Sequence, residues 1–214
     1  MGGTSQPTDV LWWIAALLRA VRFPYLSIPV LSNYPFADIP ETEGNVNLRP
    51  METKPRILGS TEGASPAINS EILEWIRDRW DTVGRLLFSD KKFKLAFQAF
   101  DSATVERDRA SSLLAIWGAL EQLFGSGRYR IASFIAAYLD PPGEGRLATY
   151  RRVLKLYDKR SAAAHTANEA EAGPLLEAYV LMRNALIKMV DEKKVPTQGN
   201  LESLLFEGVQ TADG

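Results

Sequence analysis

The hydrophobic positions from residue 65 onward recur every three or four residues, which is the spacing of amphipathic helices. In "SPAINSEILEWIRDRWDTVGRLLF" the apolar side chains Ile72 and Ile76 lie on one stripe, and Ser65 followed by Pro66 is typical of a helix start. The same spacing predicts five further helices, at residues 89–103, 103–124, 128–139, 147–165 and 173–190.

The chain before residue 64 follows a different pattern. An apolar helix is predicted to begin at Thr8 or Asp9 and to end at Pro24, and it must be buried because it is apolar almost all round. Residues 24–66 then hold seven of the 12 prolines and show no helical spacing. Within them "YLSIPVLS" is compatible with a short edge strand.

These two patterns predict the fold class and a division of the chain. Short connections between successive helices favour antiparallel neighbours. We therefore predict an all-α protein in which residues 64–214 form an antiparallel helical bundle. Residues 1–63 are predicted to form an N-terminal helix and an irregular, proline-rich arm.

Composition excludes several kinds of chemistry. The chain has no cysteine and one histidine, His165, so disulfides and thiolate chemistry are excluded. A zinc site would need carboxylates as its other ligands, and we find none with suitable spacing. "GSGRYR" also lacks the spacing of a phosphate-binding loop. We predict neither a metal nor a cofactor.

The longest apolar run is too short for a membrane span. "VLWWIAALL" covers residues 10–18, whereas a span needs about 20 apolar residues. No lysine or arginine precedes it, as a secretory signal would require. We expect a soluble, cytoplasmic protein without a membrane partner.

Basic residues are concentrated in the middle of the chain. Residues 85–160 hold 14 Lys and Arg against 8 Asp and Glu, and the remainder holds 11 against 18. This surplus indicates an anionic partner such as nucleic acid, although ordinary solvated helix faces explain it as well. "RYRIASFIAAYL" interleaves basic and aromatic residues, but its apolar spacing favours core packing, since base stacking requires exposed rings.

The stretch "YDKRSAAAHTAN", at residues 157–168, places Arg160 five residues before His165. A ribonuclease that uses the substrate's 2′-hydroxyl as nucleophile needs a group for proton transfer and a group that stabilises charge on phosphorus. Histidine suits the first task because it titrates near neutral pH, and the arginine fork suits the second.

The spacing of this pair sets a geometric condition. Five residues of helix rotate the backbone by about 140° beyond one full turn, so the two side chains would not reach one phosphate from an unbroken helix. Either the helix is interrupted, near Asp158 or between the two residues, or two chains each supply half of the site.

Two separated blocks, "LLAIWGALEQLF" at 113–124 and "YRRVLKLYDKRSAAAH" at 150–165, occur in an order that resembles the HEPN superfamily of all-α ribonuclease and RNA-binding domains. The similarity is to its ApeA-like branch, which is associated with bacterial defence against phage, and it covers about residues 70–190. Thr166 follows the histidine, where ApeA-like members usually have glycine.

The resemblance implies an endoribonuclease of a defence or toxin system, acting as a homodimer on RNA, with a further domain or partner protein possible. Arg160 and His165 match the catalytic pair, and Ser161 matches the polar residue after the arginine. Three further residues are assigned supporting roles: Asp158 positions Arg160 or the helix break, Tyr157 packs against the cleft wall, and Glu121 contacts Arg160 or His165 or is an ordinary solvated carboxylate.

Two alternatives to the enzyme remain open at this stage. One is a HEPN-type module that binds RNA or protein and dimerises without cutting. The other is a helical scaffold in which His165 is merely packed.

Overall fold

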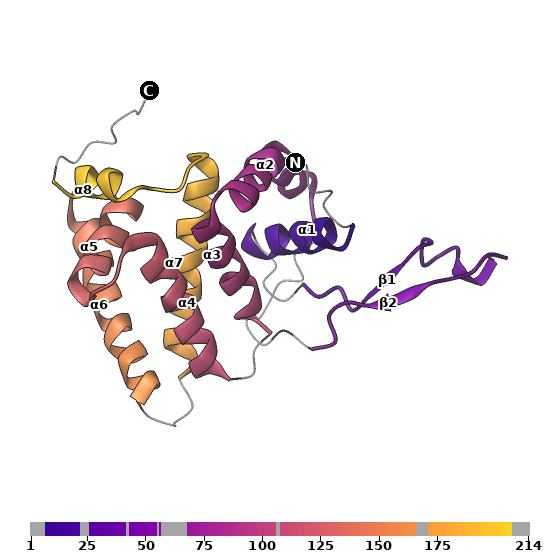
Figure 1. Cartoon of the computed structure of the whole chain (residues 1–214), viewed down its shortest axis with the longest axis horizontal. Helices are drawn as coiled ribbons and strands as arrows, with labels where there is room; N and C mark the ends of the chain where they lie inside the picture. The colour runs from indigo at the N-terminus through magenta and orange to yellow at the C-terminus, as the bar shows by residue number, and fades with distance from the viewer. Residues whose placement is uncertain are drawn as a thin grey trace. The chain divides into compact units, whose positions relative to one another are not determined.

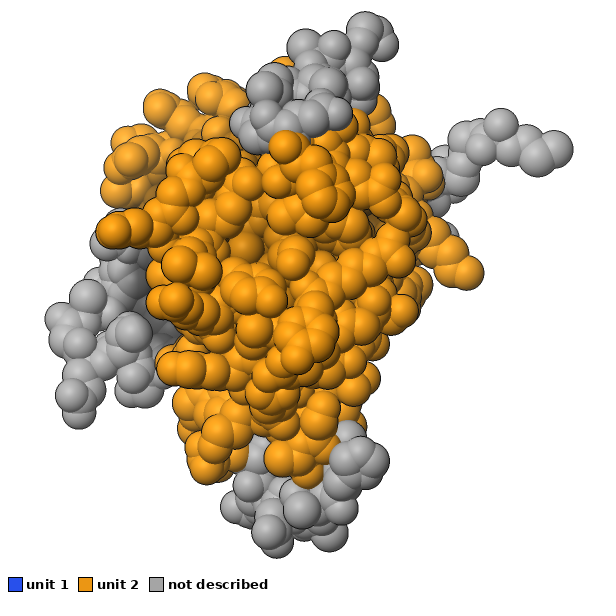
Figure 2. All heavy atoms as spheres, turned by 90° about the vertical axis from the view of Figure 1, so that its left-hand side faces the viewer, with its two compact units in different colours: residues 1–67 blue, residues 68–214 orange. Residues whose placement is uncertain are grey.

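The computed structural model of the chain is predominantly helical (Figure 1), which confirms the predicted all-α character. It describes residues 7–21, 26–41, 43–54, 56, 68–105, 108–165 and 171–206, without the side chains of 7–9 and 163–165. The chain divides into two compact units, residues 1–67 and 68–214, the second of which is orange in Figure 2. The predicted boundary after residue 63 lies outside the described residues.

Unit 2 carries all six helices that the hydrophobic spacing predicts, and one more. In its described part these are α2 (Ser70–Ser89), α3 (Lys91–Ser102), α4 (Arg109–Phe124), α5 (Arg128–Leu139), α6 (Glu144–His165), α7 (Ala172–Asp191) and α8 (Gln198–Phe206). Helix α8 has only nine residues and two buried leucines, which is too short a segment to show a periodic pattern, so the sequence did not predict it.

Acidic and amide side chains determine where three of these helices begin. Asn69 accepts a hydrogen bond from the backbone N–H of Ile72, and Asp90 accepts one from Phe93. Asp108 likewise caps α4, which therefore begins six residues later than the prediction. The predicted cap Ser65 lies outside the described residues, and α2 begins at Ser70 instead.

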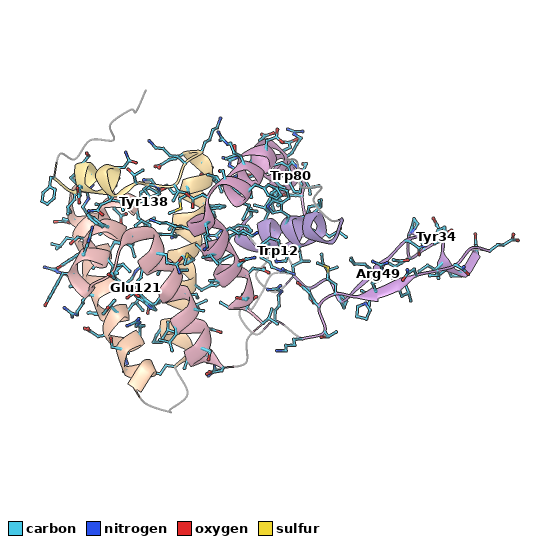
Figure 3. All side chains as sticks on the ribbon, viewed as in Figure 1. Trp12, Tyr34, Arg49, Trp80, Glu121 and Tyr138 are labelled. Carbon is cyan, nitrogen blue, oxygen red and sulfur yellow. The ribbon has the colours of Figure 1, made fainter. Side chains whose placement is uncertain are left out.

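The core of unit 2 is built around α4, which packs against α3, α5, α6 and α7. Trp117 of α4 is fully buried. Aromatic rings fill the neighbouring layers: Phe100 stacks on Tyr179 at 4.5 Å between ring centroids, and Phe124 lies 5.6 Å from Tyr138, which is labelled in Figure 3. The aromatic residues of α3, which are Phe93, Phe97 and Phe100, are thus core residues.

Unit 1 contains α1 (Pro7–Val21), β1 (Val30–Ser32), a 3-10 turn η1 (Ile39–Glu41) and β2 (Leu48–Pro50). The two strands pair antiparallel, so the short strand expected within "YLSIPVLS" is present. None of the described helices combines the length and the apolar character that crossing a bilayer requires.

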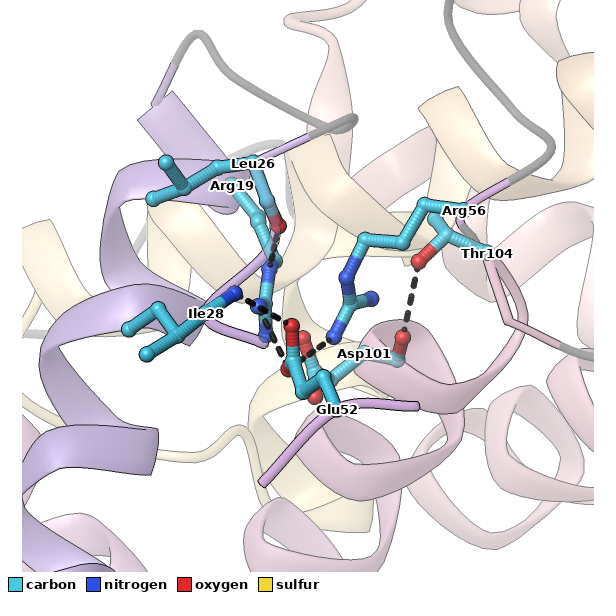
Figure 4. A network of polar contacts seen from close by, with 7 residues as sticks. All are labelled: Arg19, Leu26, Ile28, Glu52, Arg56, Asp101 and Thr104. Atoms are coloured by element: carbon cyan, nitrogen blue, oxygen red, sulfur yellow. Dashed lines mark hydrogen bonds and ion pairs between the residues drawn. The ribbon is translucent and has the colours of Figure 1, made fainter. Parts of the chain in front are cut away.

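A buried ion pair joins α1 to the segment after β2 (Figure 4). The guanidinium of Arg19, whose side chain is fully buried, donates to Glu52 at 2.6 Å, and Arg56 donates to the same carboxylate at 2.7 Å. Glu52 also accepts from the backbone N–H of Ile28, and Arg19 donates to the carbonyl of Leu26. One carboxylate therefore links three segments of unit 1.

The ionisation of Glu52 follows from these contacts. Burial alone would raise the pKa of Glu52, but the hydrogen bonds from Arg56 and Ile28 and the charge of Arg19 outweigh it and hold that pKa below its ordinary 4.5. A carboxyl with a lowered pKa stabilises the folded state at neutral pH, and this stabilisation is lost as the pH falls through the folded-state pKa.

We expect Glu52→Gln to loosen this junction. The hydrogen-exchange protection of the Ile28 amide should fall about tenfold at neutral pH, since a hydrogen bond to a charged group is worth roughly 1.5 kcal/mol or more. In the wild type the protection should decline below pH 4.5, and in the variant it should be independent of pH there. Glu41→Gln, at an exposed carboxylate of η1, is the matched control. Equal protection in the two variants would contradict the assignment.

Candidate functional site

Helix α6 runs without interruption from Glu144 to His165 and so carries both Arg160 and His165. The predicted break near Asp158 is wrong. The segment "KLYDKRSAAAH" contains no glycine or proline, and its three alanines are strong helix formers. Ser161 is accommodated within the helix, because its hydroxyl donates to the carbonyl of Tyr157, four residues earlier, at 3.2 Å.

The unbroken helix places the two residues of the pair on different sides. Arg160 follows Leu156 by four residues and Val153 by seven, and both of these are buried, so it shares their face. Position 165 is about 140° further round the axis and shares the exposed face of Asp158, seven residues earlier. The helix break that would unite the pair within one chain is therefore absent.

Arg160 is held against α4. Its Nη2 lies 3.5 Å from Oε2 of Glu121, which Figure 3 labels on α4, and its guanidinium carbon lies 5.4 Å from the ring centroid of Tyr157. The Arg160 and Glu121 side chains are 27% and 21% exposed. The predicted contact between Glu121 and Arg160 is therefore present, and the solvated alternative for Glu121 is wrong.

The Nε atom of Arg160 differs from its Nη2 atom. It is buried and has no hydrogen-bond partner among the described residues. The guanidinium therefore has one nitrogen held by a carboxylate and one unsatisfied donor that faces the protein interior, while about a quarter of the side chain stays exposed.

Tyr157 connects Arg160 to the core. Its hydroxyl donates to Oε1 of Glu121 at 3.4 Å, and its ring meets that of Trp117 nearly at a right angle, with 5.4 Å between centroids. Edge-to-face rings at this distance attract each other. The expected packing role of Tyr157 is thus directed at α4, where Glu121 and Trp117 hold it.

Asp158 does not position Arg160, contrary to our expectation. Its carboxylate accepts two hydrogen bonds from Arg128 of α5, at 2.7 and 2.6 Å. These bonds are the main reason that the pKa of Asp158 is lowered and that of Arg128 is raised. Side chains at positions 158 and 160 point to different sides of a helix, so one residue faces α5 and the other α4.

Sequence reasoning undervalued the first turn of α5. The apolar positions of "RYRIASFIAAYL" are buried, as the core-packing interpretation predicts, but Tyr129 is 65% exposed between Arg128 and Arg130. In the turn that precedes them, Gly125 has a φ of 87°, and a Cβ atom there would lie 3.3 Å from Nε of Arg130, so this position favours glycine. The sequence did contain a signal of this exposure, because Arg128, Tyr129 and Arg130 precede Ile131, the first apolar position of the helical stripe.

The ionisable groups around the motif do not form a metal centre. Within the part of the chain that the structure describes, no three His, Cys, Asp or Glu residues converge as metal ligands would. What the described residues bring together is a half-buried cation, Arg160, its carboxylate Glu121 and the phenol Tyr157. This arrangement can bind and orient an anion such as a phosphate diester.

Comparison with protein-family models, curated proteins and solved structures found no match to this chain. Its function is therefore inferred from its own residues and their geometry. The organised surroundings of Arg160 are the strongest such observation.

Proposed function

We propose that the chain is a metal-independent endoribonuclease of a bacterial defence or toxin system, with Arg160 and His165 as its catalytic pair. Its active form is a homodimer of HEPN-like helical bundles, each with a proline-rich N-terminal arm. The observation that supports this most is the setting of Arg160, which is oriented by Glu121 and Tyr157 and keeps 27% of its side chain exposed.

In the proposed reaction the RNA supplies its own nucleophile. The 2′-hydroxyl loses its proton to a base and attacks the adjacent phosphorus, and the bond from phosphorus to the 5′-oxygen breaks as that oxygen gains a proton. His165 performs one of the proton transfers, and Arg160 stabilises the negative charge that builds up on the phosphate oxygens. The products are a 2′,3′-cyclic phosphate and a 5′-hydroxyl end.

The two residues must come from different copies of the chain. On the unbroken helix α6 they lie about 140° apart, so one chain does not direct both at one phosphate. A two-fold axis brings the same patch of each copy together, so the Arg160 of one copy meets the His165 of the other. Ala162 and the two alanines after it leave room for close approach of a partner helix.

We expect the purified wild-type chain to cleave a mixed RNA pool in the presence of EDTA. Mass spectrometry of the fragments should find cyclic phosphate and 5′-hydroxyl ends, because a 2′-hydroxyl attack leaves no other termini. A pool of 2′-O-methyl RNA, which lacks the nucleophile, is the matched control and should stay intact. Cleavage of that pool, or 5′-phosphate ends, would contradict the mechanism.

A binding module without catalysis is the second candidate, and one observation favours it. The carboxylate of Glu121 already compensates the charge of Arg160, and a residue held in this way also suits a purely structural role. RNA that is shifted in a gel but not cut, with binding that weakens as salt increases, would support this candidate over the enzyme.

A further inference from the structure

The outer face of α6 and the first turn of α5 carry cations and one exposed aromatic ring. We propose that they form a binding track for single-stranded RNA that leads to the His165 end of α6. This proposal rests on the proposed function in taking RNA as the ligand, and it adds where the strand lies and which residues bind it. Both helices lie on the left-hand side of Figure 1, which is the side that faces the viewer in Figure 2.

Three cations on α6 are available to a ligand. Arg151, Arg152 and Lys155 are exposed, and none forms an ion pair or hydrogen bond with another described residue. Their spacing of one, three and four residues places them on one side of the helix. Lys159 continues this row one turn later, 3.5 Å from Glu171.

The carboxylates near this face leave it positively charged. Asp158 is occupied by Arg128 in the paired hydrogen bonds described above, and Glu171 is shared with Lys159. Glu144 stands at the other end of α6, in its first turn. Glu144 and Asp158 are the acidic residues within α6, so the middle of the helix presents cations to which a phosphate backbone can bind.

Tyr129 distinguishes single-stranded from double-stranded RNA. Its ring is 65% exposed, and the guanidinium carbon of Arg128 lies 5.0 Å from the ring centroid. An exposed ring beside cations can stack on an unpaired base while the cations bind the adjacent phosphates. In a duplex the bases are already stacked on each other, so the ring would have no partner.

The bond between Arg128 and Asp158 joins the two parts of the track. It fixes the start of α5 against α6 two turns before position 165, which lies on the same face as Asp158. A strand that runs along Arg151 and Lys155 and stacks on Tyr129 therefore continues toward His165. Arg160 faces α4 and is not part of this track.

The test measures binding of a labelled single-stranded 2′-O-methyl RNA, which cannot be cleaved, by fluorescence anisotropy at several salt concentrations. We expect R151Q/R152Q/K155Q to bind about 100-fold more weakly at 0.1 M salt. Its slope of log affinity against log salt should be shallower by about 2, because three phosphate contacts release about 0.7 ion each.

The matched control is K91Q/K92Q/K94Q, which removes the same charge from exposed lysines of α3. It should bind within about twofold of wild type, since only long-range electrostatics change. Circular dichroism should report unchanged helix content for both triple variants. Equal weakening of RNA binding by the two triple variants would contradict the proposed binding track.

Two substitutions of Tyr129 test whether its ring stacks on a base. Tyr129→Ala should weaken binding about tenfold or more, and Tyr129→Phe should bind as the wild type does, because stacking needs the ring and not the hydroxyl. Phe88→Ala, which removes another exposed ring, on α2, is the control and should have no effect. Tighter binding of duplex RNA or of polyglutamate than of the single strand would overturn the proposal.

The binding assay separates this proposal from the catalytic one. A wild type that binds through these residues but never cuts would support the track and refute the endoribonuclease. A wild type that cuts, but whose binding is the same in all variants, would refute the track and leave the endoribonuclease standing.

Discussion

Replacing His165 with alanine is expected to lower the rate of RNA cleavage by about 10²- to 10⁴-fold, the usual contribution of a general acid or base. The loss should appear in the rate at saturating RNA, because the imidazole acts in proton transfer and the cations of the track provide binding. Single-turnover cleavage of a defined RNA measures this rate. The variant should remain folded, since alanine is a better helix former than histidine at the end of α6.

A mixing experiment tests the origin of the two catalytic residues. Arg160→Ala and His165→Ala chains should each be inactive, but mixed dimers contain one site with both an arginine and a histidine. Mixing equal amounts after denaturation and refolding should restore about a quarter of the wild-type activity, since half of the dimers are mixed and each has one complete site. Activity that stays absent in the mixture would contradict the shared site, and full activity of His165→Ala alone would contradict the mechanism.

Replacing Trp117 with alanine is expected to reduce the free energy of unfolding by about 3 to 5 kcal/mol, the typical cost of removing a buried tryptophan. The side chain is fully buried in α4 and supports the ring of Tyr157 on α6. Thermal unfolding followed by circular dichroism should show a midpoint lower by about 10 °C or more.

Trp117→Phe is the control, because phenylalanine keeps most of the side-chain volume that alanine removes. The indole Nε1 of Trp117 is buried and has no hydrogen-bond partner among the described residues, so its removal relieves a cost of about 1 to 3 kcal/mol. That gain offsets most of the cost of the smaller cavity, so Trp117→Phe should lower the free energy of unfolding by about 1 kcal/mol or less. An alanine variant as stable as the phenylalanine variant would contradict the central role of this side chain.

Substitutions of Trp117 should also change the activity of the candidate site. Tyr157 depends on Trp117 for its packing, and Tyr157 and Glu121 together orient Arg160. The alanine variant should therefore lose cleavage at temperatures where it is still folded, and the phenylalanine variant should keep it.

Much of the fold was predictable because repeated apolar positions report directly on helices. Six helices of unit 2 were predicted, four of them within three residues at each end, and the contact between Glu121 and Arg160 was among the expected ones. The misses have two causes. The start of α4 is set by its Asp108 cap and not by the apolar spacing, and α8 is too short for a periodic signal.

The sequence by itself determined the all-α class, the core positions and the local pattern around Arg160 and His165, because these depend on neighbours within one or two turns. Only the tertiary structure decided that Asp158 pairs with Arg128 and that Tyr129 is exposed. Each of these depends on a contact between residues far apart in the chain or on which side of a helix is covered. Local spacing does not contain that information, because packing between helices sets it.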